Sequence, residues 1–152
     1  KFDVDPRSVS GYNLGEHGNS QFSAWSQVRV MGHPVTELAK DRDDVDLDQL
    51  AEDVRAGGYV VFHGKKHTNF GIAAAALRLV TAVLNDAHAE LPVSNFREEY
   101  GTYVGYPAII GRQGRVRQLQ LDLTDEEKDK LAASAKYIKD RFDDVSAKLD
   151  NE

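Results

Sequence analysis

The side chains best suited to chemistry in this sequence are its five histidines: His17, His33, His63, His67 and His88. His17 differs from the others because glycines flank it in the run Gly15-Glu16-His17-Gly18. Glycine lets the backbone turn tightly and approach a ligand closely. An imidazole exposed on a turn can give or take a proton near neutral pH. The pattern indicates a general acid/base at His17; the alternative is a tight turn that merely exposes a histidine.

Other patterns point to chemistry less strongly. His63 and His67 are spaced i, i+4 and could share a helix face, but no acidic partner lies nearby, so we expect no metal site. The chain has no cysteine, which excludes disulfides, thiolate metal sites and a cysteine nucleophile. The glycines at 11, 15 and 18 have the wrong spacing for a G-x-G-x-x-G nucleotide loop. We therefore expect no dinucleotide-binding loop in this chain.

The middle of the chain is predicted to form two helices. Asp46 is a good N-cap for the first, with Gln49 completing a capping box. Gly57-Gly58 is expected to interrupt or end this helix, and residues 59–62 fit either a helix or a strand. Apolar residues at i, i+3 and i+4 predict a second helix over Asn69–Ala89.

Strands are expected on both sides of the His17 turn, over Ser8–Leu14 and Phe22–Met31. Three more are expected later, the last with a possible bulge: Leu91–Phe96, Tyr103–Ile110 and Arg115–Leu121. Thr124 and Glu127 form a capping box that begins a closing helix, and the tail after Leu149 is expected to fray. This order predicts an α+β domain with a twisted antiparallel sheet and the closing helix packed on the long 69–89 helix.

Composition narrows the class of protein. The chain has 152 residues, enough for one domain, and its 41% hydrophobic and 29% charged residues are typical of a soluble globular protein. A net charge of -6 argues against nucleic acid as a partner, and the basic segment Arg112–Arg117 fits a solvated hairpin end. No apolar run approaches the roughly 20 residues of a membrane helix, and no secretory signal is evident. We expect a cytoplasmic protein.

The run Gly15-Glu16-His17-Gly18-Asn19-Ser20 resembles the active-site signature of the lactate/malate dehydrogenase family. Further segments match that family in order and spacing: Asp5–Val9, Trp25-Ser26, Thr68–Ile72, Leu91–Ser94, Tyr106–Gly111 and Leu123–Glu127. The resemblance covers essentially Lys1 to Phe142. Within the family, the stretch from Ser8 to Phe22 is most similar to L-2-hydroxyisocaproate dehydrogenases of lactic-acid bacteria.

The resemblance implies that residues 1–152 are the C-terminal, substrate-binding domain of an NAD-dependent L-2-hydroxyacid dehydrogenase. His17 would give a proton to the carbonyl oxygen of a 2-oxo acid as NADH delivers hydride, and would contact the cofactor. Thr68 would line the substrate site and Ile72 would back the nicotinamide ring. From the residues alone, Thr68 is equally well a helix N-cap and Ile72 a core residue.

The resemblance also places Gly57-Gly58-Tyr59 where family members tune substrate specificity. Small residues there would make room for a branched aliphatic substrate; the alternative is a helix C-cap. Lys66-His67 replaces the Gly-Tyr common before the family threonine, which puts a titratable ring near the cofactor.

Several required parts would come from outside the chain. The family's aspartate that orients the imidazole, its arginine that grips the substrate carboxylate and its NAD-binding domain would all lie upstream of Lys1. We therefore expect the isolated chain to be inactive, to expose an apolar docking face and to form a homo-oligomer.

Two other classes stay open. One is a stand-alone or engineered non-catalytic module, for binding or oligomerisation, derived from this domain. The other is the related NAD- and metal-dependent glycosidase fold, which the lack of cysteine disfavours because those enzymes use a Cys and His metal pair.

Overall fold

The main sheet of the computed structural model, which describes residues 1–149, is antiparallel with the order β6 (Ala89–Arg97), β7 (Thr102–Gly111) and β8 (Gly114–Gln118). All three strands were expected from the sequence. The pairing of β7 with β8 shifts register between Ile109 and Ile110, which is the expected irregularity. The tail expected to fray after Leu149 lies outside the described residues.

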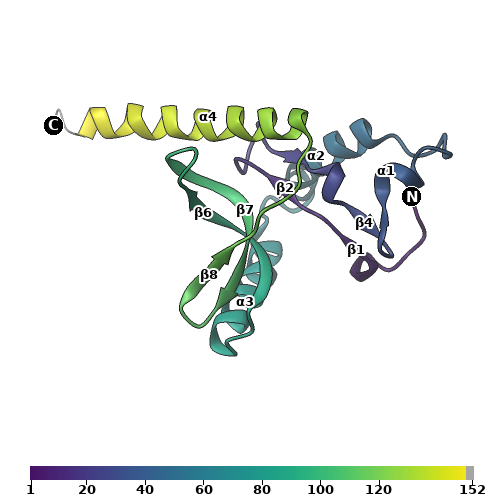
Figure 1. Cartoon of the computed structure of the whole chain (residues 1–152), viewed down its shortest axis with the longest axis horizontal. Coiled ribbons are helices and arrows are strands. Elements are labelled where there is room, and N and C mark those ends of the chain that lie inside the picture. The colour runs from purple at the N-terminus through teal and green to yellow at the C-terminus, as the bar shows by residue number, and fades with distance from the viewer. Residues whose placement is uncertain (150–152) are drawn as a thin grey trace.

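Helices α3 (Asn69–Leu84) and α4 (Asp125–Leu149) both pack on the central strand β7, toward different ends of it (Figure 1). Leu131 of α4 lies in a buried cluster with Val104 and Tyr106. Ala82 of α3 lies in a second buried cluster with Ala108. The predicted packing of the closing helix on the 69–89 helix is therefore wrong, because each helix covers its own part of the strand.

Several shorter elements replace the two continuous strands predicted around the His17 turn. They are the 3-10 turn η1 (Pro6–Ser8), strands β1 (Val9–Ser10), β2 (Asn13–Leu14) and β3 (Phe22–Ser23), the turn η2 (Trp25–Gln27), strands β4 (Arg29–Val30) and β5 (His33–Pro34), and helix α1 (Val35–Leu38). The prediction of continuous strands over 8–14 and 22–31 is therefore wrong. The backbone N–H of Ser26 donates to the Glu127 carboxylate of α4 at 3.0 Å. This N–H is therefore not available for pairing with a neighbouring strand.

Helix α2 (Leu47–Lys65) runs straight through the glycine pair. Asp46 caps it as predicted, but the Gln49 side chain bonds Asp53, so the reciprocal half of the capping box is wrong. The expected break at Gly57-Gly58, and with it the C-cap alternative, is also wrong. A glycine in a helix lowers its stability by only about 1 kcal/mol relative to alanine, and favourable interactions of neighbouring residues can offset this loss. The helix ends instead at Lys65, and the next residue, Lys66, is the C-cap, with a φ of 65°.

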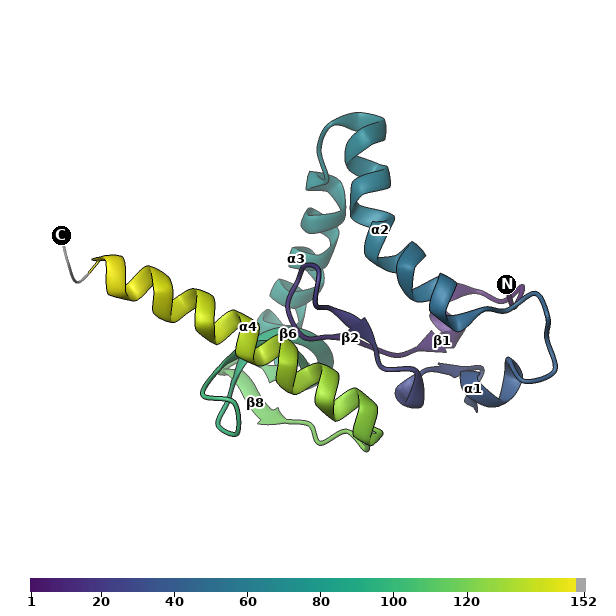
Figure 2. The ribbon, with the colours of Figure 1, turned by 90° about the horizontal axis from the view of Figure 1, so that it is seen from above.

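Helix α3 starts after Thr68 as predicted, although the Thr68 side chain makes no capping hydrogen bond. It ends at Leu84 rather than Ala89, and Asp86 and His88 beyond it adopt positive φ. Ile72 is 62% exposed, so its assignment to the core is wrong. Helices α2 and α3 project together from the rest of the molecule (Figure 2). Within residues 1–149, no helix has both the length and the apolar character to span a bilayer.

The capping box at the start of α4 is confirmed and carries an additional role. Glu127 accepts a hydrogen bond from the Thr124 N–H at 3.0 Å, and its own N–H donates to the Thr124 hydroxyl at 3.2 Å. The same carboxylate accepts from the backbone N–H and the hydroxyl of Ser26. Burial alone would raise the pKa of Glu127, but these hydrogen bonds outweigh it and lower the pKa below its ordinary value. Glu127 thus joins α4 to η2.

A pair of glycines fastens the His17 turn to the main sheet. Gly15 and Gly105 exchange backbone hydrogen bonds of 3.0 and 2.9 Å, at a stretch of β7 beyond the residues that pair with β8. A Cβ on Gly105 would lie 2.6 Å from the Gly15 carbonyl oxygen. Gly15 has a φ of 94°, and a Cβ there would lie 2.5 Å from the Ser134 hydroxyl oxygen. Neither position has room for a side chain.

Gly105→Ala should destabilise the protein by about 2–3 kcal/mol, because the new methyl group would push the Gly15 backbone off β7. Gly57→Ala is the matched control, since a Cβ there meets nothing within 4 Å and alanine favours the helix by roughly 0.5–1 kcal/mol. Urea denaturation of both variants measures the difference. Equal stability of the two would show that the glycine contact is dispensable.

Glu127→Gln should lower the free energy of unfolding at pH 7 by about 1–2 kcal/mol, since hydrogen bonds to a charged acceptor are lost. The folded state holds the Glu127 pKa below its ordinary value of 4.5, so the wild-type advantage is present above that pH and fades as pH falls below it. Urea titrations between pH 7 and pH 3 test this. A difference that is constant over that range would contradict the assignment.

Candidate active site

His17 lies on the loop between β2 and β3 and is exposed. Within residues 1–149, its imidazole forms no hydrogen bond or ion pair, so both ring nitrogens are available to a ligand. Gly15, two residues before His17, is fixed to β7 by its backbone hydrogen bonds with Gly105. The loop therefore presents an unpaired, titratable ring from an anchored backbone.

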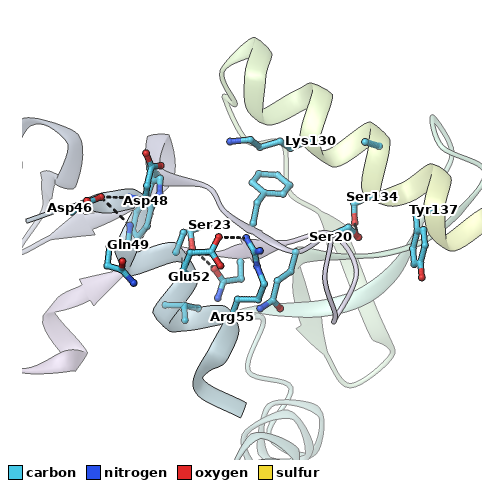
Figure 3. A pocket seen from close by; sticks show the side chains of 17 residues that line it. Ser20, Ser23, Asp46, Asp48, Gln49, Glu52, Arg55, Lys130, Ser134 and Tyr137 are labelled. Atoms are coloured by element: carbon cyan, nitrogen blue, oxygen red, sulfur yellow. Dashed lines mark hydrogen bonds and ion pairs between the residues drawn. The ribbon is translucent and has the colours of Figure 1, made fainter. Parts of the chain in front are cut away.

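Three polar side chains hold the ends of this loop together. The Glu16 N–H donates to the Ser134 hydroxyl oxygen at 2.8 Å. The backbone N–H of Ser20 donates to Glu16 Oε2 at 3.1 Å, and the Ser20 hydroxyl donates to the same oxygen at 2.5 Å. The two serine hydroxyls lie 2.8 Å apart, and Figure 3 shows Ser20 beside Ser134 of α4. The loop is thus joined to α4 as well as to the sheet.

A cavity of about 410 Å³ brings together His17, Gly58, Tyr59 and Thr68. These residues come from the loop, from α2 and from the start of α3. Two other residues singled out in the sequence, Gly57 and Ile72, are not among those lining the cavity; Ile72 lies one turn further along α3. The fold therefore gathers four of the predicted residues around the cavity and leaves two outside it.

Six further residues line the same cavity and were not predicted as site residues: Gly18, Asn19, Gln21, Val54, Arg55 and Phe62. Three of the six belong to α2 and follow its helical spacing relative to Gly58. Positions 54, 58 and 62 are i, i+4 and i+8, so they share one face. These residues were not predicted because the helix was expected to end at Gly57-Gly58. A continuous helix over 47–65 would have placed them.

The cavity combines a positive charge with an apolar wall. Arg55 carries the charge, none of the residues lining the cavity is a carboxylate, and Val54, Tyr59 and Phe62 supply apolar surface. Arg55 forms an ion pair with Glu52 at 3.2 Å, and its Nε is buried without a hydrogen-bond partner. Such surroundings suit a small anion that carries an apolar side chain.

A second and larger cavity of about 700 Å³ lies between α2 and α4 (Figure 3). Its lining includes Asp46, Asp48 and Glu52 opposite Lys130, and it shares Arg55 with the first cavity. His17 does not line it. His17 also borders a third cavity of about 580 Å³, whose lining includes Ser94 and Tyr103. The cavity with Gly58 and Thr68 is therefore the one that joins His17 to the predicted substrate residues.

The sequence model of the lactate/malate dehydrogenase α/β C-terminal domain matches residues 1–149 of the chain. The chain belongs to the lactate/malate dehydrogenase family. Its α+β fold, expected from the sequence, is confirmed by solved structures. The minor L-lactate dehydrogenase from Enterococcus mundtii in its ligands-bound form matches with a TM-score of 0.87 and 37% identity, over 93% of this chain and 48% of that one. A lactate dehydrogenase from a Medee basin deep-sea metagenome library matches with a TM-score of 0.87 and 30% identity, over 94% and 48%.

Curated relatives give the same result at the level of sequence. The chain is 42% identical to the L-lactate dehydrogenase of Streptococcus equinus over 156 aligned positions, which cover 97% of the chain and 47% of the relative. It is 40% identical to L-lactate dehydrogenase 1 of Enterococcus faecalis over 157 positions, covering 99% and 48%. The chain spans about half the length of these relatives.

Proposed function

We propose that this chain is the substrate-binding domain of an NAD-dependent L-2-hydroxyacid dehydrogenase, with His17 as its acid/base. The observation that carries the proposal is the single cavity that gathers His17, Gly58, Tyr59 and Thr68 from three separate segments. The names of the similar proteins, which are L-lactate dehydrogenases, support the same reaction.

In the proposed reaction, protonated His17 donates a hydrogen bond to the carbonyl oxygen of a 2-oxo acid and then transfers the proton to it. In the reverse direction, neutral His17 takes the proton of the hydroxyl group. A histidine suits both directions because its ordinary pKa lies near neutral pH. Arg55, with its buried and unpartnered Nε, adds positive charge to the cavity that would receive the anionic substrate.

The hydride in this reaction comes from bound NADH. The chain offers surface for one edge of the nicotinamide only: Ile72 is 62% exposed and lies one helical turn from Thr68. Side chains one turn apart share a helix face, so Ile72 can back a ring that reaches the cavity. The residues present thus fit the nicotinamide end of the cofactor, and the rest of NAD would be held by an N-terminal domain. Without that domain we expect no turnover.

The proposed substrate is a lactate-type or branched-chain 2-oxo acid, as in L-2-hydroxyisocaproate dehydrogenases. Gly58 places no side chain in the cavity wall and leaves space near His17. Phe62 and Val54, one turn away on either side, provide an apolar surface for an aliphatic group.

The proposed partners are the NAD-binding domain and further copies of the chain. Helices α2 and α3 expose many large apolar side chains: Val60, Val61, Phe62, Phe70, Ile72, Leu77, Val80 and Leu84. Apolar patches of this kind typically mark surfaces that another domain or subunit covers.

His17→Ala should lower kcat for reduction of 2-oxo acids by about 10²- to 10⁴-fold, the usual contribution of a general acid. The affinity for NADH should stay nearly unchanged, because the imidazole acts on the substrate oxygen. Steady-state kinetics and NADH titration of the enzyme that joins this chain to its NAD-binding domain make the test. His33→Ala, an exposed histidine on β5, is the matched control. Similar turnover in both variants would remove His17 from the mechanism.

Gly58→Val should reduce kcat/KM for branched 2-oxo acids relative to pyruvate by about 10- to 200-fold, because the new side chain fills space that the larger substrate needs. Gly57→Val carries the same helix penalty but does not line the cavity, so it serves as the control. The ratio of kcat/KM values for the two substrates is measured in each variant. An unchanged ratio in Gly58→Val would show that the substrate side chain lies elsewhere.

A further inference from the structure

We infer that Ser134, on helix α4, is a positioning residue that sets the orientation of His17 through a closed ring of hydrogen bonds with Glu16 and Ser20. This inference rests on the proposed role of His17 as the acid/base. Ser134 does not line the cavity that contains His17 and has no place in the chemistry proposed above.

The directions of the hydrogen bonds follow from the chemistry of the groups. A carboxylate oxygen only accepts, so the Ser20 hydroxyl donates to Glu16 Oε2 at 2.5 Å. Because the Ser20 hydroxyl proton is used in that bond, the Ser134 hydroxyl is the donor and the Ser20 oxygen the acceptor in the 2.8 Å contact between the two serines. The Ser134 oxygen in turn accepts from the Glu16 N–H at 2.8 Å. The ring begins and ends on the residue that precedes His17.

Packing leaves this ring little freedom. Ser134 is fully buried, at 0% exposure. A Cβ on Gly15 would lie 2.5 Å from the Ser134 hydroxyl oxygen, so α4 rests directly on the loop backbone. A Cβ on Gly18 would lie 2.6 Å from Glu16 Oε1, so the carboxylate folds beneath the residue that follows His17. The backbone on both sides of His17 is therefore tied to the same three side chains.

His17 itself is exposed and lacks a side-chain partner among residues 1–149, so within this chain its backbone alone sets the direction of the ring. Acid/base groups need to be held within about 0.5 Å of their productive place, and a displacement of about 1 Å can slow chemistry by 10²-fold. Loss of Ser134 would leave the partly buried Glu16 N–H without its acceptor and remove this link between the loop and α4. Proton transfer should suffer while cofactor binding does not.

The experiment compares Ser134→Ala with Ser146→Ala, a serine on the same helix outside the ring, in the enzyme that joins this chain to its NAD-binding domain. Ser134→Ala should lower kcat by about 10- to 100-fold while KM for NADH stays within about twofold. The kinetic isotope effect on kcat with deuterated NADH should rise, because chemistry becomes slower than product release. The imidazole NMR signals of His17 should shift or broaden, while those of His33 should not.

Ser20→Ala, like Ser134→Ala, breaks two of the three links, but it keeps the bond between Glu16 and Ser134 that joins the loop to α4. It should therefore show a smaller effect in the same direction. It also decides the question if Ser134→Ala does not fold. The inference is wrong if the folded ring variants turn over like Ser146→Ala, or if kcat falls only with the folded fraction while the His17 signals stay unchanged. His17→Ala in the same series tests the proposed function separately: an active His17→Ala enzyme defeats the acid/base role, whereas an inactive one beside an active Ser134→Ala defeats only the positioning role.

Discussion

The backbone contact between Gly15 and Gly105 is the constraint on which the candidate site depends. It pairs the end of β2 with the central strand β7; a Cβ on Gly105 would lie 2.6 Å from the Gly15 carbonyl oxygen, and a Cβ on Gly15 would lie 2.5 Å from the Ser134 hydroxyl oxygen. Because α4 and the C-terminal end of α3 also pack on β7, this strand sets the positions of the His17 loop and of both helices. Thr68, at the N-terminal end of α3, reaches the cavity that contains His17 through the length of that helix.

The site is built from parts that each do little alone. The loop supplies an imidazole, α2 supplies a charge and an apolar wall, and α3 supplies Thr68. Glu127 and Ser134 connect α4 to the segments after and before β3, so the helix holds both sides of the loop. Exposed apolar side chains along α2 and α3 leave this arrangement open on the side where we propose the NAD-binding domain to lie.

The features predicted correctly from the sequence are those that depend on residues close together in the chain. The glycine-flanked His17, the strands of the main sheet and the Thr124–Glu127 capping box each depend on a few neighbouring residues, and all are present. The features that were missed depend on distant contacts. The Ser26 N–H is taken by a carboxylate 101 residues away, and the Glu16 N–H by a hydroxyl 118 residues away. Continuation of α2 through Gly57-Gly58 was missed because a glycine pair weakens a helix without necessarily ending it.

The most direct test of this account is a crystal structure of the enzyme that contains this chain, solved with NAD and an unreactive analogue of a 2-oxo acid. If His17 is the acid/base, one of its ring nitrogens will lie about 2.6–3.2 Å from the oxygen that stands for the substrate carbonyl. The substrate side chain should lie against Gly58 in the cavity lined by α2. An analogue bound in the cavity between α2 and α4, or one from which His17 is turned away, would contradict the acid/base role proposed for His17.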